Sequence, residues 1–148
     1  MIKNFSEFIS ESAYFDKYQG LKNLMYQINE YGKYKIKKEN WFIYDEKNNR
    51  IGSYYMFLNE NKVLIIDKII FNDITDVKEK KVDHFKLFLE QLTKFCAQNK
   101  VIAAVSPDRI IDRKTRKSVK DEYLKNGFVP NSGKNVCPIV TETMYRPL

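Results

Sequence analysis

Asp67 is the residue whose surroundings in the sequence most favour chemistry, because it is a carboxylate inside an apolar run from Val63 to Phe71. Burial among apolar side chains raises the pKa of a carboxyl group, and this suits the group to act as a general base. The neighbouring Lys68 points to the opposite face of an extended strand. An ordinary edge or ion-paired carboxylate is the alternative interpretation.

Other reactive side chains are few and lack the spacing of a known centre. The only histidine, His84, has no cysteine or acidic partner at the spacing of a metal site or a catalytic triad. Cys96 falls on an apolar helix face and Cys137 lies beside Pro138; two cysteines form at most one bridge, so free thiols in a reducing compartment are the simpler interpretation. The sequence contains neither a phosphate-binding Walker motif nor a nucleophile elbow. We therefore expect no metal site and no serine-hydrolase chemistry.

Positive charge is concentrated in two short stretches of a chain whose formal net charge is +7. Residues 33–38 contain four lysines and no acid, and residues 109–120 contain six cations against Asp112 alone. Such a basic stretch attracts phosphate groups, either of nucleic acid or of a cofactor, and a solvated surface is the alternative. The cations expected to contact nucleic acid are Arg113, Lys114, Arg116 and Lys117.

Aromatic residues cluster in two runs, Trp41–Tyr44 and Tyr54–Phe57. Aromatic rings interleaved with basic segments can stack on the bases of single-stranded nucleic acid. Aromatic residues that alternate along a strand are also typical of a protein core. The sequence leaves both interpretations open.

The chain length of 148 residues fits one domain, preceded by an amphipathic segment over residues 1–12, so the domain occupies 13–148. No apolar run approaches the ~18 residues of a membrane span, and no secretory signal begins the chain. We expect a soluble, cytoplasmic protein that does not bind membranes.

Periodicity predicts an α+β (α/β) fold with a mixed, mostly antiparallel sheet flanked by helices on both faces. Helical spacing is found over residues 1–12 and from Asp16 to Tyr31, where Gly32 ends the helix. A three-strand meander follows, and then a long helix that is capped by Asp76 and ends near Asn99. The rest comprises an apolar strand from Val101 to Val105, a short helix capped by Ser118, and C-terminal strands. The meander strands are expected at 41–44, 51–58 and 63–71, and the C-terminal strands at 128–129 and 140–145.

The part of the chain from Trp41 to Leu148 resembles the GNAT superfamily of acyl-CoA-dependent N-acyltransferases. The resemblance rests on the apolar strand 63–71 that leads into a long amphipathic helix, on the short strand Val-Ile-Ala-Ala-Val-Ser-Pro at 101–107, and on Tyr-Leu-Lys-Asn-Gly-Phe at 123–128. The last of these is similar to the Tyr-x-x-x-Gly-Phe ending of the family's fourth helix.

This resemblance implies transfer of an acetyl or other acyl group from CoA to an amine. In the family the central strand and the next strand separate, and the pantetheine arm of the cofactor lies between them. The corresponding residues here are Ile69, Phe71 and Ser106. Tyr123 would then protonate the leaving thiolate and Asp67 would deprotonate the amine; a core aromatic with a satisfied hydroxyl is the alternative for Tyr123.

The sequence departs from the family at the pyrophosphate loop, which has the form Arg-Gly-x-Gly-x-Gly/Ala. That motif aligns with residues 76–81, where Asp76 takes the arginine position and no glycine occurs. The backbone amides and lysines of this segment would have to hold the phosphates, while two carboxylates would oppose them. Cofactor binding is therefore expected to be altered or lost. The residues concerned are Val77, Lys78, Glu79, Lys80 and Lys81.

The opening Met-Ile-Lys-Asn-Phe-Ser-Glu-Phe-Ile-Ser-Glu resembles the N-terminal segments of tailed-bacteriophage proteins that are packaged into the capsid. This resemblance implies a phage-encoded protein located in the host cytoplasm or the virion. An amphipathic helix that docks Phe5, Phe8 and Ile9 on the domain is the alternative. A non-catalytic accessory protein that binds nucleic acid or protein on the same fold is therefore the second functional hypothesis, beside the N-acyltransferase.

Overall fold

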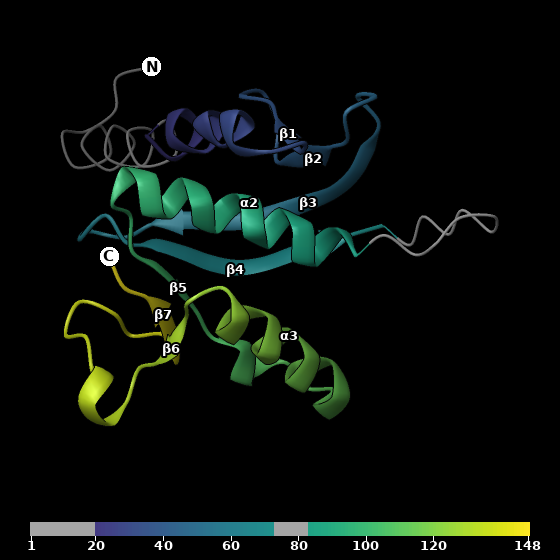
Figure 1. The fold of residues 1–148 in the computed structure, drawn as a ribbon. Helices are drawn as coiled ribbons and strands as arrows, with labels where there is room; N and C mark the ends of the chain where they lie inside the picture. Colours follow the sequence, from purple (N-terminus) through teal and green to yellow (C-terminus); the bar gives the residue numbers. More distant parts are fainter. Residues whose placement is uncertain (1–19, 73–82) are drawn as a thin grey trace, which may run out of the picture.

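The computed structural model describes residues 20–72 and 83–148. Within these residues the chain forms an α+β fold around a seven-stranded open sheet, with strand order β1-β2-β3-β4-β5-β7-β6 (Figure 1). β4 and β5 are parallel and every other pair is antiparallel, so the predicted mixed, mostly antiparallel sheet is confirmed. The strands are β1 (Lys35–Ile36), β2 (Phe42–Tyr44), β3 (Arg50–Leu58), β4 (Leu64–Phe71), β5 (Ala103–Val105), β6 (Val129–Pro130) and β7 (Met144–Arg146).

Helical segments connect these strands. Residues 20–26 are α-helical and continue into the 3-10 helix η1 (Gln27–Tyr31). The longest described helix, α2 (His84–Asn99), crosses from β4 to β5 and so makes their parallel pairing feasible. The remaining helices are η2 (Pro107–Arg109), α3 (Arg113–Lys125) and η3 (Gly133–Asn135). No helix in the described ranges is both long enough and apolar enough to cross a bilayer.

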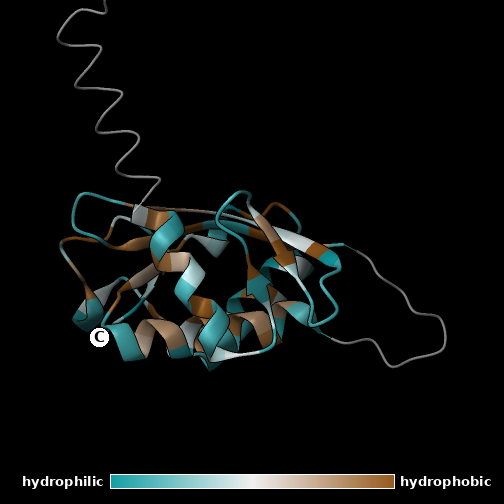
Figure 2. Ribbon diagram, turned by 90° about the horizontal axis from the view of Figure 1, so that it is seen from above, coloured by the Kyte–Doolittle hydropathy of each residue, from teal (hydrophilic) through white to brown (hydrophobic). Residues whose placement is uncertain are grey.

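The larger core lies between the sheet and the helices. The helical residues 20–31, α2 and α3 all contribute to it, and alternate residues of the strands fill the other side. α2 buries one face and exposes the other, which is visible in Figure 2 as bands of both colours along the long helix. The fully buried side chains at its centre include Tyr54, Phe88, Leu89, Leu92 and Phe95.

The opposite side of the sheet carries a smaller core without a long helix. Ile65, Ala104 and Tyr145 point to this side and pack with Val63 and Val140. The segment between β6 and β7, which contains only η3, covers them. The expectation of helices on both faces is therefore wrong for the α-helices of the described residues: residues 20–26, α2 and α3 all contribute to the larger core, and the short 3-10 helix η3 lies in the segment over the smaller core.

A buried amide fixes the turn between η1 and β1. The side chain of Gln91, only 3% exposed, donates to the carbonyls of Ile28 (2.8 Å) and Tyr34 (2.9 Å) and accepts from the Tyr34 amide (3.0 Å). Gly32 makes room for it, because a Cβ at this position would lie 2.4 Å from the Gln91 Oε1 atom. The predicted helix end at Gly32 is confirmed, but the reason for glycine is this close approach, since its φ of 174° is ordinary extended backbone.

Two helix starts differ from the sequence prediction. α2 is capped by Asp83, which accepts from the Lys86 amide, rather than by Asp76, which lies outside the described residues. α3 begins at Arg113 and is capped by Asp112 rather than Ser118, so most of the basic stretch is helical and not a loop. Apolar periodicity is missing from the first turns of α3, which explains why they were predicted as loop. β1 was not predicted, because a two-residue strand has no periodicity to detect.

Candidate functional site

β4 differs between its two halves. Leu64–Ile66 pair with β5 on one side and β3 on the other, and all three residues are buried. Beyond Ile66 the β5 ladder ends, while β4 continues to Phe71 along β3 alone. The register also shifts here: Tyr55 pairs with Lys68 and Met56 with Ile66, so Asp67 is an extra residue in a β-bulge. Bulges bend a strand and are common next to active sites.

The N-terminus of α2 lies beside this second half of β4. The His84 ring stacks on Phe71, the last residue of β4, with 5.7 Å between ring centroids. The next residue, Phe85, meets the Tyr123 ring of α3 edge-on at 5.8 Å. The end of β4, the start of α2 and the last turns of α3 are therefore neighbours.

Tyr123 is buried where α2 and α3 meet. It is only 2% exposed, and its ring packs between Phe85 and Phe128, whose centroid lies 4.9 Å away. Burial raises the pKa of the Tyr123 phenol well above its ordinary value, so the hydroxyl keeps its proton at neutral pH. This environment agrees with the core-aromatic interpretation and also leaves a protonated donor in place.

Asp67 does not have the burial that the sequence predicted. It is exposed, as is the adjacent Lys68, because β5 and the segment that covers the smaller core both end before this part of β4. The first half of β4 is thus covered on both faces, whereas its second half is covered only on the side of the larger core. Any proton transfer by Asp67 therefore depends on its place at the bulge and not on an apolar environment.

The expected cofactor contacts are partly described. Ile69 and Phe71 are half-buried and pack against the larger core, so their side chains point toward α2. Ser106 follows β5, and its hydroxyl oxygen accepts from the Thr143 amide at 3.3 Å. The predicted phosphate-binding residues Val77, Lys78, Glu79, Lys80 and Lys81 lie outside the described residues.

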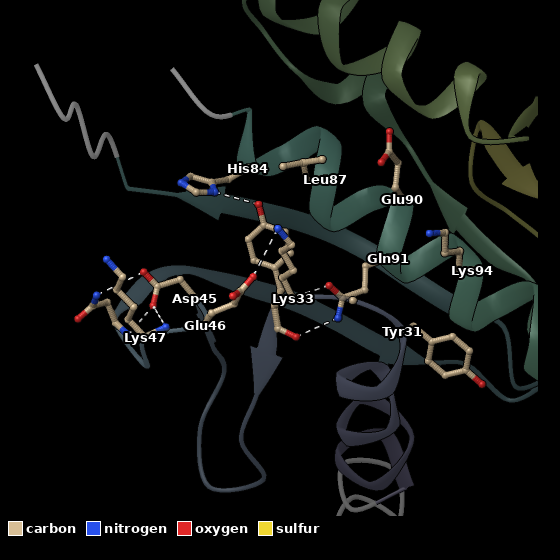
Figure 3. Close-up of a pocket in the computed structure, with 13 residues that line it drawn as sticks. Tyr31, Lys33, Asp45, Glu46, Lys47, His84, Leu87, Glu90, Gln91 and Lys94 are labelled. Atoms are coloured by element: carbon tan, nitrogen blue, oxygen red, sulfur yellow. Dashed lines mark hydrogen bonds and ion pairs between the residues drawn. The ribbon is translucent and has the colours of Figure 1, made fainter. Parts of the chain in front are cut away.

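A cavity lies beside α2, and the sequence did not predict it. This cavity of about 670 Å³ is bounded by α2, the η1–β1 turn and the β2–β3 turn (Figure 3). His84 Nδ1 and the Tyr34 hydroxyl form a hydrogen bond of 2.9 Å at its upper end. Burial, with a smaller contribution from Asp83, raises the pKa of Tyr34 to about 12, so the phenol keeps its proton at neutral pH.

Opposite charges line this cavity in similar numbers. Lys33 and Glu46 form an ion pair of 3.6 Å, while Asp45 accepts hydrogen bonds from Asn49 and Lys47, which hold its pKa below the ordinary range. Glu90 and Lys94 face the cavity from α2 (Figure 3). Sequence patterns missed this site because its walls come from segments that are far apart along the chain.

The predicted nucleic-acid contacts lie on α3. Arg113, Lys114 and Lys117 are exposed, whereas Arg116 is half-buried and donates to the Ile110 carbonyl at 3.2 Å. Lys120 is paired with Asp108 at 3.3 Å. The first turns of α3 thus present several cations to solvent from a rigid helix.

The described residues contain no group of three or more histidine, cysteine or acidic side chains that could hold a metal ion. Comparisons of this chain with protein-family models, with curated proteins and with solved structures give no match.

Proposed function

We propose that this protein is a GNAT-like N-acyltransferase that moves an acyl group, most simply acetyl, from CoA to an amine. The observation that carries the proposal is the loss of β5 pairing after Ile66, while β4 continues for five further residues beside α2 and α3. β5 itself ends at Val105, so the second half of β4 runs beside the N-terminus of α2 without a parallel partner. We place the pantetheine arm of the cofactor there, next to the end of β5. The acceptor is proposed only as an amine, in a small molecule or a protein.

The proposed reaction forms a C–N bond and breaks the thioester C–S bond. Asp67, at the bulge of β4, takes the proton of the attacking amine directly or through water. Tyr123 donates its phenolic proton to the departing thiolate; because burial raises the pKa of Tyr123, the phenol carries this proton at neutral pH. Ile69, Phe71 and Ser106 would border the cofactor, and the residues from Val77 to Lys81 would meet its phosphates.

Calorimetry with acetyl-CoA and an assay of Tyr123→Phe test this proposal. We expect heat of binding at micromolar acetyl-CoA and a turnover lowered about 10²-fold or more in Tyr123→Phe, as for loss of a general acid. Tyr54→Phe is the matched control, because the Tyr54 hydroxyl is also buried and has no hydrogen-bond partner among the described residues. No binding at high micromolar acetyl-CoA, or equal turnover of the two variants, would contradict the proposal.

The second candidate is a non-catalytic accessory protein of phage type that binds nucleic acid. The exposed cations Arg113, Lys114 and Lys117 on α3 favour it, since a cationic helix attracts the phosphate backbone without reading sequence. Duplex DNA binding with a steep salt dependence, weakened in a Lys114→Ala, Lys117→Ala variant and accompanied by no acetyl-CoA binding, would support this function over the enzyme. Unchanged duplex affinity in that variant would contradict it.

A further inference from the structure

One side of the sheet between β2 and β4 carries exposed aromatic and aliphatic side chains. These residues alternate with core residues: Ile43, Tyr54 and Ile69 point toward the helices, so their neighbours point away. We name this surface the open sheet face. Tyr55 is 47% exposed and Ile70 is 44% exposed, and the other ring-bearing members are half-buried. It consists of Phe42, Tyr44, Ser53, Tyr55, Lys68 and Ile70.

The register places these residues in rows across the strands. Phe42 faces Ser53, which in turn faces Ile70, and Tyr55 faces Lys68 in the next row. Successive rows on one face of a sheet are about 7 Å apart, twice the rise of a strand residue. Phe42 and Tyr55 therefore lie in neighbouring rows of this surface.

Each ring of the open sheet face has its own cation. The Arg50 guanidinium lies 3.4 Å from the centroid of the Phe42 ring, the Lys37 amino group lies 4.0 Å from that of Tyr44, and the Lys68 amino group lies 4.9 Å from that of Tyr55. These three cation–aromatic pairs are spread over three strands and the turn before β2.

The charges of these cations are not neutralised locally. No carboxylate oxygen of the described residues comes within 4.0 Å of the charged nitrogens of Lys37, Arg50 or Lys68. The exposed Asp67 beside Lys68 is the one carboxylate of β2, β3 and β4, so the three cations leave the open sheet face with a net positive charge, and a second copy of the same surface would be repelled from it. Its charge instead matches a polyanion that also offers flat apolar groups.

We propose that the open sheet face binds single-stranded nucleic acid. Unpaired bases would stack on the Tyr55 ring and on the guanidinium plane of Arg50, which covers Phe42, while the phosphates would contact Lys37 and Lys68. A duplex hides its base faces and could use only the cations, and an anionic bilayer favours apolar side chains that protrude into it. The proposal does not depend on the N-acyltransferase activity, because Phe42, Tyr55 and Lys68 take no part in that reaction.

Fluorescence anisotropy of the full chain with a labelled oligo(dT) tests the proposal. An abasic strand of equal length, which has the same phosphates without bases, should bind roughly tenfold more weakly, because stacking supplies a large part of the affinity. The corresponding duplex and phosphatidylglycerol vesicles should also compete weakly. No oligo(dT) binding at high micromolar protein, equal affinity for the abasic strand, or preferred binding of duplex or vesicles would overturn the proposal.

Tyr55→Ala should weaken oligo(dT) binding roughly tenfold, and Tyr55→Phe should keep nearly all of the affinity because the ring remains. The matched control is Tyr26→Ala: Tyr26 is also 47% exposed and also has a lysine, Lys38, at 4.9 Å, but it lies on the helix at residues 20–26. Circular dichroism melting checks that each variant folds. An unchanged affinity in Tyr55→Ala, or an equal loss in Tyr26→Ala, would refute stacking on this face.

Lys68→Ala gives an independent readout through salt dependence. Removal of one phosphate contact should reduce the slope of log affinity against log salt by about 0.7 for a single strand. When Tyr55→Ala is added to the double variant Lys114→Ala, Lys117→Ala on α3, it should still weaken oligo(dT) binding roughly tenfold. If instead the α3 variant abolished oligo(dT) binding and Lys68→Ala left the slope unchanged, the binding site would be α3 and the proposal would be wrong.

Discussion

The two sides of the β2–β4 sheet are built from adjacent residues and have opposite properties. Tyr54 is fully buried against Trp41 and the helices, whereas the next residue, Tyr55, is nearly half exposed beneath Lys68. In the same way, Ile43 is more buried than Phe42, and Ile69 is more buried than Ile70. An aromatic run in the sequence thus divides between stabilising the core and forming a surface, and strand alternation decides which residue does which.

The largest expected effect separates the two sides by stability. Phe88→Ala removes a fully buried ring of α2 and should lower the free energy of unfolding by about 3–5 kcal/mol. Tyr55→Ala on the open sheet face should lower it by less than about 1 kcal/mol. Urea unfolding of both variants measures this difference. If both variants lost a similar free energy of unfolding, the open sheet face would contribute to stability as much as the core does.

A smaller effect is expected from the buried amide that joins α2 to the η1–β1 turn. Gln91→Leu keeps the volume but leaves the hydrogen-bonding groups of Ile28 and Tyr34 without their partner, which should cost about 2–4 kcal/mol. Gln98→Leu, the same change at an exposed position of α2, should be nearly neutral. Urea unfolding of the two variants provides the comparison, and equal stabilities would show that Gln91 is not required to hold the turn.

The smallest effect concerns Lys22, whose amino group lies 3.5 Å from the centroid of the Trp41 ring on the helix-covered side. Burial lowers the pKa of Lys22 to about 8, an effect that Glu39 partly opposes. Since the ordinary pKa of lysine is about 10.4, the unfolded chain binds more protons between these two values. Lys22 should therefore make the protein more stable as pH rises from about 8 toward 10.

Two measurements check the Lys22 prediction. The free energy of unfolding of the natural chain, measured relative to that of Lys22→Met, should rise with pH over that window. Trp41 is the only tryptophan, so its fluorescence should titrate near pH 8 in the natural chain and in Lys38→Met, but not in Lys22→Met. A Trp41 signal that stays flat through this range in the natural chain would contradict the lowered pKa.

Much of the fold could be predicted from local patterns. The meander, the long helix and the apolar strand after it are confirmed, because their hydrophobic periods and turn residues are consistent over many positions. Gly127, for example, has the positive φ of 89° that suits a helix C-terminus. The start of α3 was mispredicted because its first turns are polar all round and give no period.

The candidate sites were less accessible to prediction. Tyr123 was predicted as a general acid or, alternatively, as a core aromatic; its burial agrees with the second interpretation, yet nothing local could tell how completely Phe85 and Phe128 enclose it. Asp67 was expected to be buried because its run is apolar, and its exposure results from the end of β5 some forty residues later in the chain. The cavity beside His84 and Tyr34 has no signal in either segment alone.

By itself, the sequence determined the elements, the two concentrations of positive charge and the alternation that splits each aromatic run. These properties follow from side-chain chemistry and from the periods of helices and strands, which act over a few residues. Only the tertiary structure decided that the pairing of β5 with β4 ends at Ile66. It also decided that the helices cover one side of the β2–β4 sheet and that cations lie over the rings of the other side. Those outcomes depend on contacts between segments that are distant in the sequence. Packing sets the energies of these contacts, and no local sequence pattern reports them.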